Sequence, residues 1–185
     1  MGGIISSPFF KVIAGGVLAF VLIMVFSSII SGGKANVKEQ TLSLKFTVEN
    51  TLQMISDYQN KLKSSDLRSS TASLYSVLSN TDRSLEEYVT EKYSYKKGSK
   101  DYTAIQEEAT THFDEVEDDL FEAKINGLLD RVFAHKMAYE ISMITTKEEG
   151  IYNASSDETL GTILTTSYNS LNNLYDKFSN FSETK

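Results

Sequence analysis

Residues 67–88 read LRSSTASLYSVLSNTDRSLEEY, and this stretch decides the fold. Seven of its side chains recur in alternating steps of four and three residues: Leu67, Thr71, Leu74, Leu78, Thr81, Leu85 and Tyr88. An α-helix places residues with this spacing on one face, and Ser, Arg and Glu occupy the opposite face. The stretch therefore predicts a helix that buries one side, with N-cap candidates in Ser64, Ser65 and Asp66.

The same spacing recurs in four other segments, at about 37–63, 101–125 and 128–147, and from Ser155 or Ser156 to about 181. Their apolar faces are Leu44, Val48, Leu52, Ile55, Tyr58 and Leu62; Ile105, Ala109, Phe113, Val116, Leu120 and Ala123; Leu128, Leu129, Val132, Phe133, Met137, Ile141 and Ile144; and Leu160, Ile163, Ser167, Leu171, Leu174, Phe178 and Phe181. We expect the helix that starts at 128 to end at Gly150. Asn126-Gly127 is either a turn between two helices or a kink inside one.

Composition agrees with an all-helical chain. The 185 residues include one proline, Pro8, and no cysteine. Few prolines favour long helices, and the lack of cysteine excludes disulfides, thiol nucleophiles and zinc knuckles. No segment of useful length alternates with period two. The predicted fold class is all-α, with an antiparallel bundle of four or five helices at 37–181 and a short tail at 182–185.

A separate apolar segment precedes the bundle. Residues 12–30 read VIAGGVLAFVLIMVFSSII and carry no charge. As a helix they extend about 28 Å, close to the hydrocarbon thickness of a bilayer. We therefore predict one transmembrane helix at 12–30, after a tail at 1–11 and before a linker at 31–36. A cleaved signal peptide is the alternative, but the apolar run exceeds the usual 7–15 residues.

Four further features concern the membrane. Gly15 and Ala19 form a small-xxx-small pair, which predicts a packing face for self-association. Met1-Gly2 matches the start of a myristoylation pattern, which would be redundant beside a spanning helix. Lys11 on one flank and Lys34, Lys38 and Lys45 on the other do not fix the orientation. The 24 Ser and 16 Thr, with no Cys, favour a bundle on the extracytoplasmic side.

Charge is concentrated on one predicted helix. The chain has a net charge of −7, and all 25 acidic residues follow residue 38. Glu115, Asp118, Asp119 and Glu122 lie at i, i+3, i+4 and i+7, on one helix face, which predicts an acidic interaction face for a partner. The alternative is a solvated face without a ligand. The acidic balance argues against nucleic acid as a partner.

Residues that could support catalysis are scarce. The two histidines, His112 and His135, follow Ala109 and Val132 by three positions, so the Glu-x-x-His motif of dimetal bundles is missing. Phosphate-loop and nucleophile-elbow motifs are also missing. We therefore expect no enzymatic activity, no metal and no cofactor, with both histidines in packing or surface roles. Lys92, Lys96, Lys97 and Lys100 form a basic patch that we expect to be a helix end and its loop.

Two blocks, KLKSSDLRSSTASLYSVLSNTDRSL (61–85) and RVFAHKMAYEI (131–141), carry a resemblance. Together with the apolar N-terminal segment, they resemble uncharacterised single-pass membrane proteins of reduced-genome bacteria, which have no assigned activity. The expected function is a membrane-anchored scaffold or interaction protein of the cell envelope. Its partners would be the lipid bilayer and a protein, or a second copy of the chain. The alternatives are a ligand-sensing bundle that relays to a partner and, less favoured, a metal-binding bundle.

Overall fold

Five long helices joined by short connections make up the part of the chain that the computed structural model describes, residues 36–93 and 98–182. These are α2 (Val37–Tyr58), α3 (Ser65–Tyr93), α4 (Lys100–Ile125), α5 (Leu129–Ala154) and α6 (Glu158–Ser179), with a short 3₁₀ turn η1 (Gln59–Lys61) after α2. No strand occurs in these two ranges. The prediction of an all-α bundle is confirmed there.

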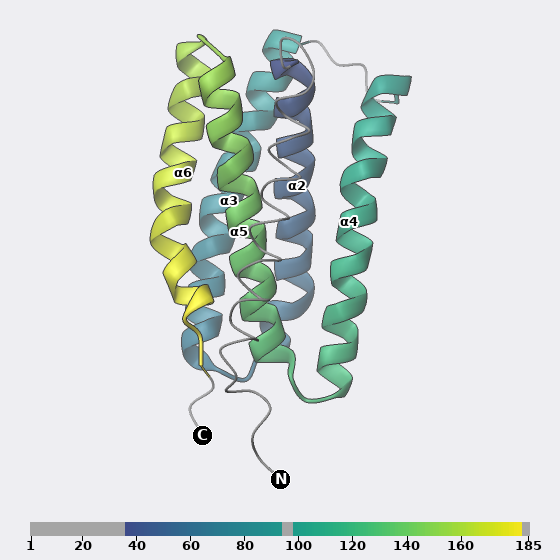
Figure 1. Cartoon of the computed structure of the whole chain (residues 1–185), viewed down its shortest axis with the longest axis vertical. Helices are drawn as coiled ribbons and strands as arrows, with labels where there is room; N and C mark the ends of the chain where they lie inside the picture. Colours follow the sequence, from purple (N-terminus) through teal and green to yellow (C-terminus); the bar gives the residue numbers. More distant parts are fainter. Residues whose placement is uncertain (1–35, 94–97, 183–185) are drawn as a thin grey trace, which may run out of the picture. The chain divides into compact units, whose positions relative to one another are not determined.

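Four of the helices close a ring. Each of α2, α3, α6 and α5 packs against the next, and α5 packs back against α2. Neighbours around the ring run antiparallel (Figure 1), which the short connections favour. The fifth helix, α4, packs outside this ring against α2 and α5, parallel to the first and antiparallel to the second. One side of α4 therefore faces away from the core.

The predicted stripes form the core. All seven positions of the 67–88 stripe are buried in α3, and the stripes of the other helices are buried or packed against the core, except Leu128. Helix α2 contacts three other helices, α3, α4 and α5, and α5 likewise contacts α2, α4 and α6. Helix α2 buries Leu42, Phe46 and Met54 in addition to its predicted stripe. The central position of α2 follows from the apolar residues that lie off its stripe.

Three predicted boundaries are wrong. Helix α2 ends at Tyr58, before the predicted 63, because the chain tightens into η1 and then turns extended at Leu62. Helix α5 continues through Gly150 to Ala154, so Gly150 is an interior residue. Helix α6 begins at Glu158, because the Asp157 carboxylate accepts a hydrogen bond from the Leu160 N–H at 3.0 Å and so acts as the N-cap in place of Ser155 or Ser156.

Asn126-Gly127 is a turn that ends α4. Gly127 has a φ of 71°, in the left-handed region that glycine adopts without steric cost. The Leu128 N–H donates to the Ala123 carbonyl at 2.8 Å, and the Gly127 N–H donates to the Lys124 carbonyl at 3.3 Å. This pair of bonds is a Schellman motif, which satisfies the last carbonyls of the helix. The alternative of a kinked continuous helix is excluded.

Asp130, the second residue of α5, joins two turns of the bundle. Its carboxylate accepts hydrogen bonds from the backbone N–H of Lys63, at 3.0 and 3.1 Å, and of Ser64, at 2.7 Å. These N–H groups precede α3, where helix geometry leaves donors without a partner and favours negative charge. A buried carboxylate thereby fixes the α2–α3 turn against the start of α5.

The predicted membrane helix at 12–30, with Gly15 and Ala19, lies outside the residues that the structure describes, as do 183–185 and most of the linker. Among the helices from 36 to 182, none combines the length and apolar character that crossing a bilayer requires. The anchor therefore stays a prediction from sequence.

The Gly127 turn makes a first prediction. Gly127→Ala should lower the free energy of unfolding by about 1 kcal/mol, because alanine is strained at positive φ. Gly150→Ala is the matched control, since its backbone is helical and a Cβ there meets no atom within 4 Å. That change should stabilise the chain by up to about 1 kcal/mol. Urea unfolding of both variants measures this, and equal effects of the same sign would contradict the role given to Gly127.

Candidate functional sites

The predicted acidic face lies on the outer side of α4. The four side chains of this face are all exposed to solvent: Glu115, Asp118, Asp119 and Glu122. Asp119 forms an ion pair with Lys136 of α5, so part of the charge is compensated within the fold. The other three carboxylates face outward from a helix that packs on one side only.

Two large apolar side chains lie next to this acidic face. Phe121 is 55% exposed and Ile125 is 69% exposed, although both belong to a helix with a buried face. They are one turn apart, and Asp118 and Glu122 lie beside them at helical spacing. We call Asp118, Phe121, Glu122 and Ile125 the α4 stripe. Sequence reasoning missed Phe121 and Ile125, because it searched for apolar residues in register with the core stripe.

A polar cluster lies where α4 meets α5 and α2. The His112 Nε2 atom and the Glu140 Oε1 atom are 2.8 Å apart, and Glu140 is only 2% exposed. Lys147, two turns along α5, donates to the hydroxyls of Ser43 at 3.1 Å and Thr47 at 2.8 Å in α2. This cluster joins the outer helix α4 to the ring. It also gives the buried Glu140 carboxylate a hydrogen-bond partner, which a buried charge requires.

The charges in this cluster shift one another. The hydrogen bond to the Glu140 carboxylate raises the pKa of His112, with burial and Lys147 opposing and Glu115 assisting. Burial lowers the pKa of Lys147, against the attraction of Glu108 and Glu140. His112 is half-buried, and its ring lies within hydrogen-bond distance of the Glu140 carboxylate. His135 is exposed, and nowhere in 36–93 or 98–182 do three potential metal ligands converge.

A second polar cluster lies between α2 and α3. Lys45 is 3% exposed, and its Nζ lies 2.5 Å from the Glu49 carboxylate and 3.1 Å from that of Glu86. Burial raises the pKa of the neighbouring Asp82, and its Oδ1 has no hydrogen-bond partner. Lys45, one of the lysines that follow the apolar N-terminal segment, therefore has its ammonium paired inside the bundle.

The basic patch is only partly described, because residues 94–97 lie outside the described ranges. Lys92 near the end of α3 forms an ion pair with the Asp157 carboxylate at 3.5 Å. Asp157 is the N-cap of α6, so this cation joins two helix ends. The contact supports the interpretation of Lys92 as part of a helix end.

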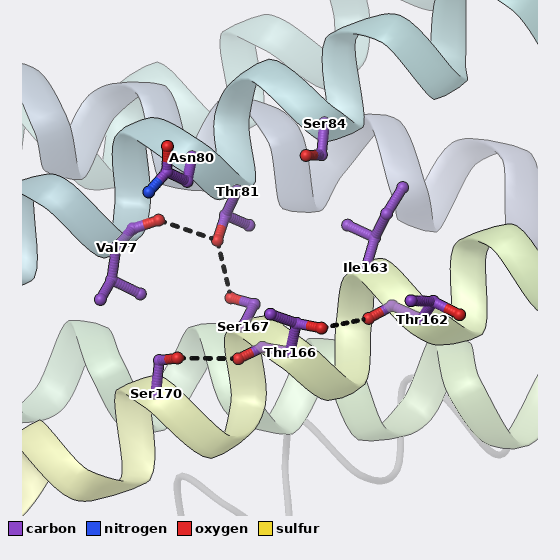
Figure 2. A pocket seen from close by; sticks show the side chains of 9 residues that line it. All are labelled: Val77, Asn80, Thr81, Ser84, Thr162, Ile163, Thr166, Ser167 and Ser170. Atoms are coloured by element: carbon purple, nitrogen blue, oxygen red, sulfur yellow. Dashed lines mark hydrogen bonds between the residues drawn. The ribbon is translucent and has the colours of Figure 1, made fainter.

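A cleft of about 270 Å³ opens between α3 and α6 (Figure 2). Seven of its nine lining residues are polar and none is charged: Asn80, Thr81, Ser84, Thr162, Thr166, Ser167 and Ser170, with Val77 and Ile163. The Thr81 hydroxyl donates across the cleft floor to the Ser167 hydroxyl at 2.9 Å. Sequence reasoning placed Thr81 and Ser167 in core stripes and did not predict that they meet.

Glu148 of α5 lies next to this floor. It is 1% exposed, and neither carboxyl oxygen has a partner that meets hydrogen-bond geometry. Burial raises the pKa of Glu148 to about 8, although the nearby Ser167 hydroxyl acts in the opposite direction. A buried acid that is neutral at pH 7 is costly to keep, and such groups concentrate at functional sites. The cleft is a candidate ligand site, and Glu148 is a buried acid behind its lining residue Ser167.

The buried acid gives a pH prediction. Between pH 4.5 and about 8, Glu148 holds its proton in the folded chain but loses it on unfolding, so stability falls as pH rises. Glu148→Gln should flatten this slope and raise stability at pH 7 by about 3 kcal/mol, at about 1.4 kcal/mol per pKa unit. Thermal unfolding across pH checks this. Glu149→Gln, at an exposed site, is the control and should leave the slope unchanged.

The His112 ion pair predicts a second pH effect. A raised pKa means that the folded chain holds the proton more tightly, so the stabilisation is complete below pH 6.5 and is lost as pH rises through the folded-state pKa. His112→Gln should remove this loss of stability above pH 6.5. The decrease in stability between pH 4.5 and 6, which we assign to Glu148, should remain. His135→Gln is the control. An unchanged slope above pH 6.5 in His112→Gln would contradict the assignment.

No family model matches this chain, and no curated protein or solved structure matches it either. The resemblance carried by residues 61–85 and 131–141 therefore stays a prediction.

Proposed function

We propose that this chain is a membrane-tethered helical interaction protein, whose partner binds the α4 stripe. In this proposal residues 12–30 span the bilayer once and the bundle lies on the extracytoplasmic side. The bundle presents a binding surface and performs no chemistry.

The exposure of Phe121 and Ile125 is the observation that carries the proposal. Single exposed apolar residues are common, but two on adjacent turns form a continuous patch. Burying such area on binding contributes about 25 cal/mol per Å². Asp118 and Glu122 supply a charged rim at its edge, the arrangement found around aromatic anchors in interfaces. The favoured partner surface is therefore apolar with a basic rim.

The fold also favours α4 for this role. Its inner face packs on α2 and α5, and polar contacts such as His112–Glu140 and Asp119–Lys136 fix its position. A binding stripe on a helix held this way is preorganised, which lowers the entropic cost of association. A ligand-sensing role is the second candidate, and the α3/α6 cleft favours it.

Site-specific crosslinking tests the proposed surface. A photo-crosslinking amino acid at Phe121, in the full chain in its own membrane, should give a discrete adduct with a partner. Tyr75 is the matched control, because it is an exposed aromatic residue on α3 of the ring. Asp118→Lys together with Glu122→Lys should reduce the adduct at 121 at least fivefold. Equal adducts from both positions, or none at 121, would contradict the proposal.

Cysteine labelling tests the anchor and the orientation. The chain has no cysteine, so Ser76→Cys on the exposed side of α3 creates a single thiol. Ser99, just before α4, is a less suitable place for the cysteine, because its hydroxyl accepts a hydrogen bond from the Tyr102 N–H and caps the helix. An impermeant maleimide should label this thiol in intact cells, and carbonate washing should leave the chain in the membrane. Labelling only after lysis would reverse the orientation, and release by carbonate would exclude the span.

A further inference from the structure

Helix α4 carries a second stripe with steps of four and three residues, on the side opposite to its buried stripe. All seven of its positions are exposed: Glu107, Thr111, Asp114, Asp118, Phe121, Ile125 and Leu128, of which the last lies in the turn after the helix. We call these seven positions the outer stripe. The buried stripe of the same helix, with Phe113, Val116 and Leu120, packs on the ring. Steps of four and three form the seam along which two helices pack side by side.

The outer stripe changes character along its length. Its first four positions include three carboxylates and no apolar residue. Its last three positions are apolar, and their side chains are between 39% (Leu128) and 69% (Ile125) exposed. No Lys or Arg occurs from 102 to 123, so no cation of this part of the helix offsets the carboxylates. A surface that covers the stripe therefore has to supply positive charge to one half and apolar area to the other.

A second copy of the chain does not meet this requirement. In a parallel pair each position of the outer stripe faces its own counterpart, so Asp114 and Asp118 each face a carboxylate, and this repulsion opposes association. In an antiparallel pair with full overlap, Phe121 faces Asp114 and Leu128 faces Glu107, so carboxylates lose water against apolar side chains. A pair that overlaps only at the apolar ends buries three side chains per copy, which is short of the area of about 800 Å² per partner that stable interfaces bury.

We propose that the outer stripe binds an amphipathic helix of a different protein, whose own seam is basic over one half and apolar over the other. The proposal rests on the proposed function, because it names the partner of the same surface. The basic half lies beside the carboxylates from Glu107 to Asp118, and the apolar half lies against the side chains from Phe121 to Leu128. Those apolar side chains have the i, i+4 and i+7 spacing of the anchors through which helices recognise one another. An anionic lipid surface is disfavoured, because it repels the carboxylates.

Two synthetic helical peptides of the same composition test the division of the stripe. In the block peptide the seam carries four Lys followed by three Leu, and in the mixed peptide the same residues alternate. The block peptide should shift the amide resonances of Asp118 and Ile125 in the 185-residue chain, in mild detergent, at a concentration at least tenfold lower than the mixed peptide. Both peptides carry the same charge, so their unspecific attraction to the acidic chain is equal. Equal affinities would overturn the proposal.

Charge reversal tests the acidic half of the stripe. Asp114→Lys together with Asp118→Lys should weaken binding of the block peptide at least tenfold, and should strengthen binding of a block peptide with Glu in place of Lys by a similar factor. Glu87→Lys together with Glu91→Lys is the matched control, because both residues are exposed on α3 at the same i, i+4 spacing. The control makes the same change in net charge and should leave both affinities within twofold. Equal effects of the two pairs would overturn the role given to the carboxylates.

The crosslink at Phe121 separates a failure of this inference from a failure of the proposed function. An adduct with a basic, helical segment of another protein would support both. An adduct at twice the mass of the chain, or with an acidic segment, would overturn the inference and leave α4 as a binding surface. The absence of any adduct at 121 would contradict the proposed function and, with it, this inference.

Discussion

A ring of four antiparallel helices has room for one core, which α2, α3, α5 and α6 enclose, and Phe113, Val116 and Leu120 of α4 extend it. The remaining helix, α4, packs on the outside against two neighbours, so only half of its surface is needed for folding. Its other half is free to carry Phe121, Ile125 and a row of carboxylates. The separation between a stabilising core and an available surface follows from this packing constraint.

The buried ionisable groups between the helices differ in whether they have a partner. Lys45 is paired with Glu49 and Glu86 between α2 and α3, and Glu140 has His112 as a hydrogen-bond partner between α4 and α5. Such pairs offset the desolvation cost and fix which helices meet. Glu148 has no such partner and stays protonated at neutral pH. Asp82 shares part of this situation, because its Oδ1 is also without a partner and burial raises its pKa.

The spacing of apolar residues in the sequence predicts which face of each helix is buried. The stripe from Leu67 to Tyr88 determined the buried face of α3, and the Asn126-Gly127 pair marked the end of α4. Periodicity does not say which helix lies at the centre, so Leu42, Phe46 and Met54 of α2 had no assigned neighbour. Nor does it pair residues across helices: Thr81 with Ser167, or His112 with Glu140, meet only after the ring closes.

The Asp130 carboxylate has a consequence for the order of assembly. It satisfies the Lys63 and Ser64 N–H groups from 67 and 66 residues further along the chain. The ribosome completes α2 and α3 before it adds Asp130. Contacts of such long sequence separation slow folding. We therefore expect the α2–α3 turn to be completed late, when the start of α5 packs against it.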